Sequence, residues 1–185
     1  MSMKKILIFN GSPRPHGDTQ ALIDAFLSGL SPEDECRVVS CRDKISPCLD
    51  CRYCHMHDGC AIRDGMDEIY AYLAVCDVVV LASPVWFSAL SGPALDLSSR
   101  LQTYFAAKYL RRESIAIKPK RGVILLCGGQ AGTEKNAVES ARIILSLVNV
   151  KKDDITVVTS MDTDRVAAED DITAIRAARM AAEQL

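Results

Sequence analysis

Short apolar segments alternate with longer amphipathic segments along the whole of this 185-residue chain. The apolar segments are nearly continuous and rich in β-branched residues, as in strands that are covered on both faces. In the amphipathic segments, apolar residues recur at helical spacing. The pattern predicts strands at about 6–9, 35–40, 77–82, 122–127 and 154–160. It predicts helices at about 18–30, 66–75, 91–108, 133–148 and 167–183.

This alternation predicts an α/β fold, with one doubly wound parallel sheet of about five strands and helices on both faces. Periodicity alone leaves the strand order open. With no repeat or linker in the sequence, we expect a single domain over 1–185. Ligands of such sheets bind at the carboxyl ends of the strands. We therefore expect the loops at 10–19, 83–91 and 127–133, which follow three strands, to converge on one crevice.

Composition narrows the classes of partner. The formal net charge is −2, so the balance of charge predicts neither a nucleic-acid nor a membrane-surface partner. No segment has the length and apolarity of a membrane span, and the first residues do not resemble a signal peptide. These features lead us to expect a cytoplasmic protein. In that compartment, eight cysteines indicate metal, cluster or redox chemistry rather than a disulfide framework.

The first loop has the composition of a phosphate site. It joins a buried strand to a helix, and unpaired N–H groups and the helix dipole favour an anion at a helix start. Ser12, Arg14 and Thr19 add side-chain donors. The loop is not a Walker A motif, since Asp18 follows Gly17, and it lacks the glycines of a dinucleotide fingerprint. An ordinary βα turn is the competing interpretation. We expect Asp18 to cap the helix and face away from the anion.

The loops after two later strands suit a flat ring. The segment 83–87 offers a proline turn, backbone N–H groups and two aromatic residues, Trp86 and Phe87. A flavin needs apolar walls and a few such donors at its polar edge. Core packing is the competing interpretation for both aromatic residues. Gly128 and Gly129 equally fit a plain turn, and they gain weight only from sharing the crevice with the other two loops.

Five of the eight cysteines lie in the segment 41–63, which has no helical or strand periodicity. Four of these five are closely spaced. Their spacing is C-x2-C-x2-C-x5-C, formed by Cys48, Cys51, Cys54 and Cys60. Thiolates spaced in this way can surround one face of an iron–sulfur cubane, and the fourth can close it. A zinc ion held by four thiolates, with His55 and His57 nearby, is the main alternative, and disulfides formed in air are the third.

Other chemistry-bearing residues receive ordinary interpretations. Cys36, Cys41, Cys76 and Cys127 lie in or beside apolar elements and are expected to be buried core thiols. His16 either donates to a phosphate or faces solvent. The basic segments 111–112 and 118–121 either attract the phosphate of a nicotinamide nucleotide or are solvated loop charges.

Nearly the whole chain resembles the NAD(P)H-dependent FMN reductases of the flavodoxin-like fold, and more narrowly the iron–sulfur flavoproteins. The residues that carry the resemblance are Gly11-Ser12-Pro13-Arg14 with Gly17 and Thr19, the four spaced cysteines, Ala82-Ser83-Pro84-Val85-Trp86-Phe87, and Gly128-Gly129. The four-cysteine spacing is the mark of the narrower group. In the helix after the third strand, Leu95 and Ser99 replace the Lys and Asp common in the family, whereas Arg100 is retained.

The resemblance implies strand order 2-1-3-4-5 and a homodimer or tetramer with FMN near a subunit interface. The residues expected to bind FMN are Ser12, Arg14, Gly17, Asp18, Thr19 and Gln20 around the phosphate, Pro84, Val85, Trp86, Phe87 and Ser88 along the isoalloxazine ring, and Gly128, Gly129 and Gln130 at its other edge. Cys48, Cys51, Cys54 and Cys60 are expected to hold a [4Fe–4S] cluster, and NAD(P)H is the expected co-substrate.

The leading hypothesis is an FMN oxidoreductase that moves electrons from NAD(P)H to a quinone or another small acceptor. It needs no catalytic side chain, because the flavin supplies the chemistry. A different class of function is a non-enzymatic electron carrier that docks to a ferredoxin-like partner. A third is a structural zinc module on the same fold, which metal analysis would distinguish.

Overall fold

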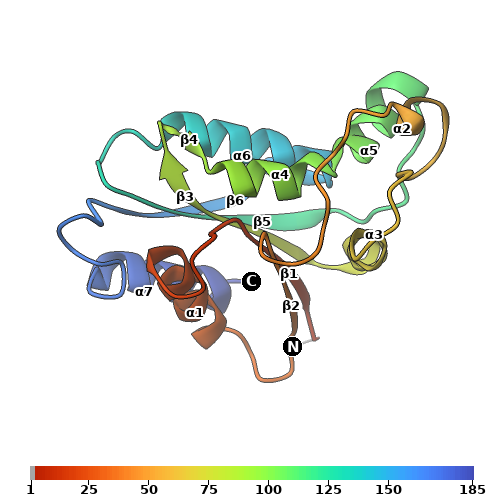
Figure 1. Ribbon diagram of the computed structural model, residues 1–185. Coiled ribbons are helices and arrows are strands. Elements are labelled where there is room, and N and C mark those ends of the chain that lie inside the picture. Colours follow the sequence, from red (N-terminus) through yellow and green to blue (C-terminus); the bar gives the residue numbers. More distant parts are fainter. Residues whose placement is uncertain (1–2) are drawn as a thin grey trace.

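The computed structural model describes residues 3–185, and a largely parallel β-sheet lies at its centre (Figure 1). The strands run in the order β2-β1-β3-β5-β6, and the short β4 pairs with β3. Their bounds are β1 (Lys5–Asn10), β2 (Glu35–Ser40), β3 (Val78–Trp86), β4 (Ala89–Leu90), β5 (Lys120–Gly128) and β6 (Val150–Met161). The sheet thus has six strands rather than five, and the five parallel strands keep the order that the resemblance implies.

The sixth strand arises because β3 continues past residue 82 into a hairpin. Val85 pairs with Leu90, and Trp86 pairs with Ala89, both antiparallel. Phe87 and Ser88 form the turn, with φ of 52° and 62°. A two-residue hairpin of this kind needs positive φ at both turn positions and usually uses Asn, Asp or Gly there. Neither residue carries that signal, so the sequence predicted a loop.

Helices cover both faces of the sheet (Figure 1). On one face, α1 (Asp18–Ser28) lies beside α7 (Ile172–Glu183). On the other face lie α3 (Met66–Val75), α4 (Gly92–Ser99) and α6 (Lys135–Leu147). The short helices α2 (Tyr53–Met56) and α5 (Gln102–Phe105) form a projecting group with the π-helix η1 (Ala106–Arg111). This group is at the upper right of Figure 1.

The strands divide the core into two layers because successive side chains point to opposite faces. In β1, Leu7 and Phe9 pack with the helices α3, α4 and α6. Ile6 and Ile8 pack on the opposite face, with α1 and α7. All four side chains are buried. This two-sided burial explains why the strands read as continuous apolar runs.

Several element boundaries differ from the prediction. The helix predicted at 91–108 is divided into α4, α5 and η1. Helix α7 begins at Ile172 rather than 167, after Asp171, whose carboxylate accepts the Ala174 N–H at 3.0 Å as an N-cap. Strand β6 begins at Val150, four residues early, because 151–154 are charged and exposed at a sheet edge, where charge is common.

The burial of the lone cysteines is only partly as expected. Cys76 and Cys127 are buried, but Cys36 and Cys41 are half-buried, so the prediction of four core thiols was wrong for these two. Cys36 lies on β2, an edge strand, and Cys41 directly follows it. Among residues 3–185, no helix is long and apolar enough to cross a membrane.

Candidate functional site

Hydrogen bonds anchor the loop that joins β1 to the start of α1. The Gly11 N–H donates to the Ala82 carbonyl at 2.8 Å, and the Ser12 N–H donates to Asn10 Oδ1 at 3.0 Å. Gly17 is the N-cap residue of α1, and no side chain caps this helix start. The N–H groups of the first turn, which have no intrahelical partner, are therefore free of a capping side chain. This feature fits an anion site.

Asp18 was expected to cap the helix, but this prediction was wrong. Asp18 is instead the first helical residue, and its side chain makes no capping hydrogen bond. Its Oδ1 accepts the Ala168 N–H at 3.0 Å, which ties the loop to the segment before α7. Its Oδ2 lies 3.5 Å from an Arg14 guanidinium nitrogen. The Arg14 side chain is largely exposed and lies beside Gly17. The guanidinium is thus close to the helix start and accessible to a ligand.

Thr19 and Gln20 turn toward the protein. Thr19 Oγ1 lies 3.1 Å from the sulfur of Cys127, at the end of β5. Gln20 Oε1 accepts a hydrogen bond from the Asn10 side chain at 3.1 Å. Burial raises the pKa of Cys127 to about 11, so this thiol is a neutral partner for Thr19. The contact joins the first loop to the third.

An arginine that the sequence did not indicate, Arg42, supports the first loop from the turn after β2. Arg42 donates from one guanidinium nitrogen to the carbonyl oxygens of Ser12, at 2.8 Å, and Arg14, at 3.2 Å. These bonds keep both carbonyl groups occupied on one side of the loop. Nothing in the pattern around Arg42 distinguishes it from a solvated charge after a strand, so sequence reasoning missed it.

The second loop carries the exposed aromatic residues. Phe87 is fully exposed and Trp86 is 42% exposed, so the interpretation of both as core residues is wrong. Beneath them, the buried Ser91 hydroxyl donates to the Gly11 carbonyl at 2.8 Å, and the Ser91 N–H donates to Ser83 Oγ at 3.1 Å. This buried pair of serines fixes the hairpin against the first loop.

The two glycines of the third loop are needed for close approach. A Cβ at Gly128 would lie 3.1 Å from the Cβ of Val85, and one at Gly129 would lie 2.2 Å from a carboxylate oxygen of Asp164. Gln130, which follows, is exposed. Together with the Thr19–Cys127 and Ser91–Gly11 contacts, these distances confirm that the three loops converge.

One cavity beside the first loop has the wrong charge for a phosphate. It has a volume of about 410 Å³ and is lined by His16 and by the carboxylates of Asp18, Asp24 and Glu169. Carboxylates repel an anion, so a phosphate is better placed on the side of the loop that faces the other two loops.

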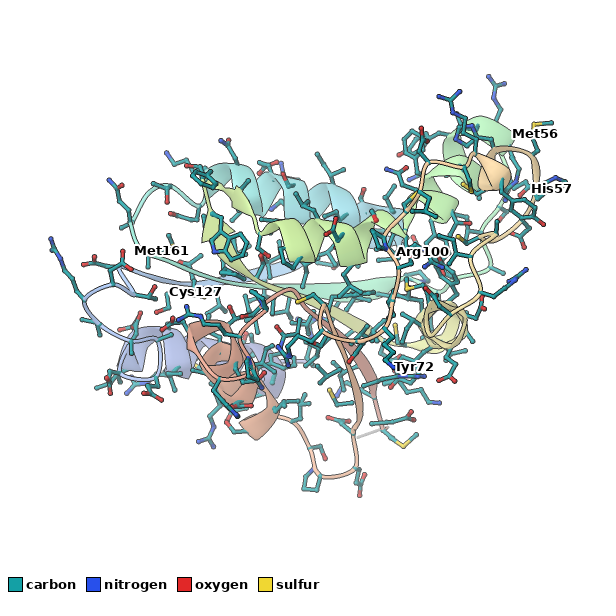
Figure 2. The ribbon with its side chains drawn as sticks, in the orientation of Figure 1. Met56, His57, Tyr72, Arg100, Cys127 and Met161 are labelled. Carbon is teal, nitrogen blue, oxygen red and sulfur yellow. The ribbon has the colours of Figure 1, made fainter. Side chains whose placement is uncertain are left out.

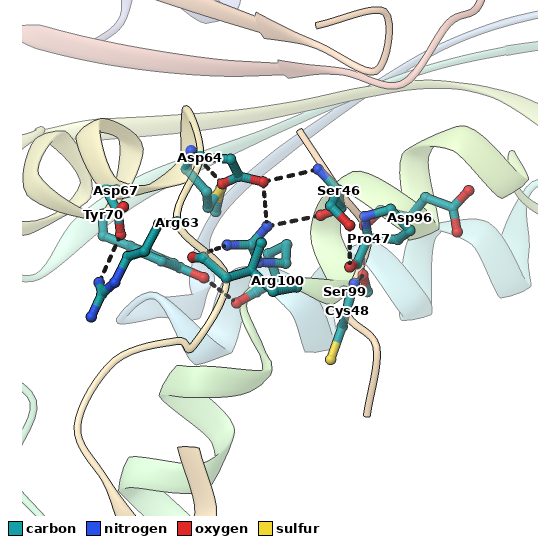
Figure 3. Close-up of polar contacts among 12 residues, drawn as sticks. Ser46, Pro47, Cys48, Arg63, Asp64, Asp67, Tyr70, Asp96, Ser99 and Arg100 are labelled. Carbon is teal, nitrogen blue, oxygen red and sulfur yellow. Dashed lines mark hydrogen bonds and ion pairs between the residues drawn. The ribbon is translucent and has the colours of Figure 1, made fainter. Parts of the chain in front are cut away.

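The cysteine-rich segment is fastened at its base by Arg100, which directly follows α4 (Figure 3). Its guanidinium donates to the carbonyl oxygens of Ser46, at 2.9 Å, and Ile62, at 3.2 Å, and to Asp64 at 2.8 Å. These partners precede and follow the four cysteines in the chain. Arg100 is 1% exposed, and its Nε has no hydrogen-bond partner within residues 3–185.

Arg100 and Asp64 stabilise each other in their charged forms. Burial alone would raise the pKa of Asp64, but hydrogen bonds from Arg100 and from the Ser46 and Met66 N–H groups outweigh it and hold the pKa below 3.8. Burial likewise opposes the charge on Arg100. The hydrogen bond and the negative charge of Asp64 offset it, so the pKa of Arg100 lies above its ordinary value.

The tip of the segment is held by a second arginine, on η1. The side chain of Arg111 donates to the carbonyl oxygens of Cys54 and His57, the latter at 2.9 Å. It also pairs with Asp58 and Glu113. At the other end, the Cys48 N–H donates to Ser99 Oγ at 2.9 Å (Figure 3). The fold thus holds the segment at several points, although its regular secondary structure is limited to the single turn of α2, which sequence periodicity did not indicate.

All four spaced cysteines line one small cavity of about 60 Å³, together with Arg52, His55 and Arg100. Burial raises the pKa of the Cys54 thiol, and charge on Cys48, Cys60 and Cys51 raises it further. All eight cysteines are free thiols. Within residues 3–185, however, no three His, Cys, Asp or Glu side chains are arranged closely enough to hold a metal ion. The donor set fits a thiolate-bound group, but the thiols would have to turn inward.

The two candidate regions are well separated. Figure 2 shows Cys127, beside the first and third loops, toward the left of the sheet, whereas Arg100 and His57 are toward the right. Helix α4 connects them, because Ser91 at its start bonds to the first loop and Ser99 at its end bonds to Cys48.

Comparison with known proteins places this architecture. An iron-sulfur flavoprotein of Methanocaldococcus jannaschii is 30% identical over 82% of this chain and 78% of its own length. An iron-sulfur flavoprotein of Methanosarcina thermophila is 30% identical over 74% and 70%. The fold is similar to an NAD(P)H:quinone oxidoreductase from Methanothermobacter marburgensis, with a TM-score of 0.74, 18% identity and coverage of 99% and 96%. Residues 4–164 match the family described as NADPH-dependent FMN reductase. The chain therefore belongs to the NADPH-dependent FMN reductase family.

Proposed function

We propose that this protein is an FMN-binding oxidoreductase that takes electrons from NAD(P)H and passes them to a small acceptor such as a quinone. Family membership supports the class of cofactor and reaction. The observation that carries the proposal is the convergence of an uncapped helix start, an exposed aromatic hairpin and a close-packed glycine turn. Together they offer an anion site and an apolar platform along one edge of the sheet.

The first loop would hold the phosphate end of FMN. Backbone N–H groups at the start of α1 supply donors, and the helix dipole supplies partial positive charge. Arg14 is close enough to the helix start to add a charged donor. Ser12 and Thr19 are buried, and they shape the loop through their internal hydrogen bonds. The residues assigned here are Ser12, Arg14, Gly17, Asp18, Thr19 and Gln20.

The hairpin and the glycine turn would hold the ring. Trp86 and Phe87 are exposed although they are large and aromatic, as is typical of side chains that bind a flat ligand or a partner. Gly128 lies against Val85, so the third loop borders the same platform. The residues assigned to the ring are Pro84, Val85, Trp86, Phe87, Ser88, Gly128, Gly129 and Gln130.

Bound FMN supplies the hydride and electron chemistry, and the protein supplies position and electrostatics. The chain's own part is to fix the phosphate, orient the ring against the hairpin and exclude water from one of its faces. No side-chain acid or base is assigned, because the proposal places no proton transfer on the protein.

We further propose that Cys48, Cys51, Cys54 and Cys60 hold a [4Fe–4S] cluster. Support comes from the shared cavity, the buried arginine beside it and the names of two relatives. Four thiolates suit such a cluster, which would handle electrons one at a time. Zinc suits the same four thiolates. Iron, sulfide and zinc analysis of protein purified without oxygen separates the two, and zinc without iron would overturn the cluster.

The enzyme proposal is tested by steady-state oxidation of NADH and NADPH with FMN-loaded protein and a quinone, free flavin or dye acceptor. Turnover that depends on bound FMN is the expected result. FMN-loaded protein that oxidises neither nucleotide with any of these acceptors would overturn the enzyme proposal while leaving FMN binding intact.

A second candidate is an electron carrier that docks to a ferredoxin-like protein. The observation that favours it is the exposure of Cys51 among the exposed apolar side chains Leu49, Tyr53 and Met56. Rapid electron exchange with reduced ferredoxin, together with negligible nucleotide oxidation, would support this candidate instead. A homodimer or tetramer is proposed for either function, because the exposed Trp86 and Phe87 would place the flavin platform next to apolar surface that a second copy can cover. Sedimentation analysis tests the oligomeric state.

A further inference from the structure

Arg100 is the least exposed large side chain of the molecule that carries a charge, and it borders the cysteine cavity. Its hydrogen bonds to Ser46, Ile62 and Asp64 explain why it stays near the base of the segment. They do not explain its Nε, a buried donor without a partner within residues 3–185. Such a donor is costly, and native structures rarely leave one without a function or an absent partner.

The surroundings define what kind of partner is missing. The same cavity is lined by the four thiols and by Arg100. Four thiolates around any bound metal group carry net negative charge, which burial disfavours unless a positive charge compensates for it. A guanidinium offers both a charge and a directed N–H group.

Other cations near the cavity are less suited to this role. Arg52 also lines the cavity, but its side chain is 71% exposed and is paired loosely with Asp50 at 3.8 Å, so water screens its charge. Arg111 binds carbonyl groups at the tip of the segment, and two carboxylates, Asp58 and Glu113, balance its charge. Arg100 has one carboxylate partner, Asp64.

We propose that Arg100 is a positioning residue for the thiolate-bound group: its Nε–H donates to a sulfur of that group, and its charge stabilises the group's negative charge. The inference rests on the proposed cysteine-bound cluster. It gives Arg100 a function beyond fastening the segment. For a cluster that gains one electron, a positive charge favours the reduced form, so Arg100 raises the midpoint potential.

The test compares three variants by EPR-monitored redox titration of anaerobic protein. Arg100→Gln removes the charge and the Nε donor, and we expect a potential lower by about 59 mV, which is a tenfold change for a one-electron couple. Arg52→Gln removes an equal but exposed charge at the same cavity, and we expect a much smaller shift. Asp64→Asn weakens the same base of the segment but removes a negative charge, so its shift should be upward.

The sign of the shift separates electrostatics from loosening. If the segment merely loosens, Arg100→Gln and Asp64→Asn will shift the potential in the same direction, and the inference is overturned. Equal shifts for Arg100→Gln and Arg52→Gln also overturn it. Circular dichroism checks folding. Should Arg100→Gln not fold, Arg100→Lys keeps the charge but lacks the Nε donor. We expect this variant to bind Cd²⁺ less tightly than the unaltered chain. Unaltered Cd²⁺ binding would overturn the donor role.

A second probe keeps this inference separate from the proposed cluster. Cadmium titration, followed by thiolate-to-metal absorbance, reports on the four thiolates without iron. We expect roughly tenfold weaker Cd²⁺ binding in Arg100→Gln, in the range for loss of a partner outside the ligand shell. If the unaltered chain takes up no iron or sulfide yet shows this loss, the cluster proposal fails and the role of Arg100 stands. If it takes up iron but Arg100→Gln matches it in both probes, the role of Arg100 fails.

Discussion

Phe87 combines an unfavourable backbone with a fully exposed aromatic ring. Its φ of 52° lies in the left-handed region, which costs a residue with a side chain about 1 kcal/mol relative to glycine. Its side chain gains nothing from packing, since it is fully exposed. Neither feature serves the fold of the isolated chain. A function at the proposed ring site accounts for both, in line with the tendency of strained residues to lie at such sites.

We expect Phe87→Gly to have opposite effects on the stability of the apoprotein and on FMN binding. Without FMN, the variant should gain about 1 kcal/mol in the free energy of unfolding, because glycine adopts the turn without strain. With FMN, it should bind less tightly, because a ring face is lost. Urea denaturation and flavin fluorescence titration measure the two effects. An apoprotein that loses stability would show that Phe87 packs in solution.

Arg42 gives a second residue-scale prediction. Arg42→Ala frees the Ser12 and Arg14 carbonyl groups and should weaken FMN binding about tenfold, or about 1.4 kcal/mol, the size of one charged hydrogen bond. Riboflavin, which lacks the phosphate, should bind equally to both proteins. Arg37→Ala, on the preceding strand β2 and paired with Glu68, is the matched control. Equal loss for FMN and riboflavin would contradict a role in the phosphate loop.

Residues of the candidate site divided into those with a local signal and those without one. The meeting of the three loops and the grouping of the four cysteines around one cavity could be predicted, because spacing and turn chemistry are local properties. Arg42 and Arg100 could not, since each acts on carbonyl groups far away in the sequence. Asp18 was misassigned as a cap for a related reason: its partner is the distant Ala168 N–H.

At the scale of elements, the cysteine segment depends on Asp64 for its attachment. Its pKa is held below the ordinary value of 3.8. A lowered folded-state pKa contributes stability that is complete above the unfolded value and is lost as the pH falls through the folded value. We therefore expect the segment to detach below about pH 4, while the sheet, to which this carboxylate makes no hydrogen bond, persists.

Asp64→Ala tests this dependence. Loss of one partner of a buried ion pair should lower the free energy of unfolding by about 3 kcal/mol at neutral pH. Its stability should then vary less with pH between about 2 and 4 than that of the unaltered chain. Thermal denaturation across this pH range measures both effects. An unchanged pH dependence would assign the acid sensitivity to other carboxylates.

Helix boundaries after α4 show where periodicity stops being a guide. Apolar residues continue at helical spacing from 93 to 107, so one helix was predicted. The chain instead breaks after Ser99, where Arg100 turns to the cysteine segment, and resumes as α5 and the π-helix η1. π-helical turns often mark functional sites, and η1 ends at Arg111, which holds the tip of that segment. Tertiary bonds, rather than propensity, set these boundaries.

At the scale of the whole molecule, the proposed FMN site and the proposed cysteine site lie apart, so we expect FMN and iron to bind independently. Cys54→Ala removes one of the four proposed ligands and should abolish iron uptake, whereas FMN binding at the other end of α4 should stay within a factor of two. Iron analysis and flavin fluorescence measure the two. The conservative control is Cys36→Ala, a half-buried thiol outside the cavity, which should lose neither. Loss of FMN with loss of iron would show that the sites fold as one unit.

The architecture followed from the sequence better than the site did. Continuous apolar strands alternating with amphipathic helices allow few arrangements, and the observed parallel order is one of them. The β3–β4 hairpin escaped prediction because Phe87 and Ser88 adopt a conformation their side chains disfavour. The early start of β6 escaped it because charged residues 151–154 form an edge strand.

Helix α4 spans eight residues, about 12 Å, between the Ser91 hydroxyl group, which bonds to the first loop, and the Ser99 hydroxyl group, which bonds to Cys48. The length of α4 therefore fixes the distance between the two attachment points. Inserting or deleting a single residue would rotate everything beyond it by about 100° and swing Arg100 out of the cysteine segment, while Ser91 stayed in place. Substitutions on the exposed face of α4 should be tolerated. Related proteins that retain both hydrogen-bonded attachments should keep the same number of residues in this helix.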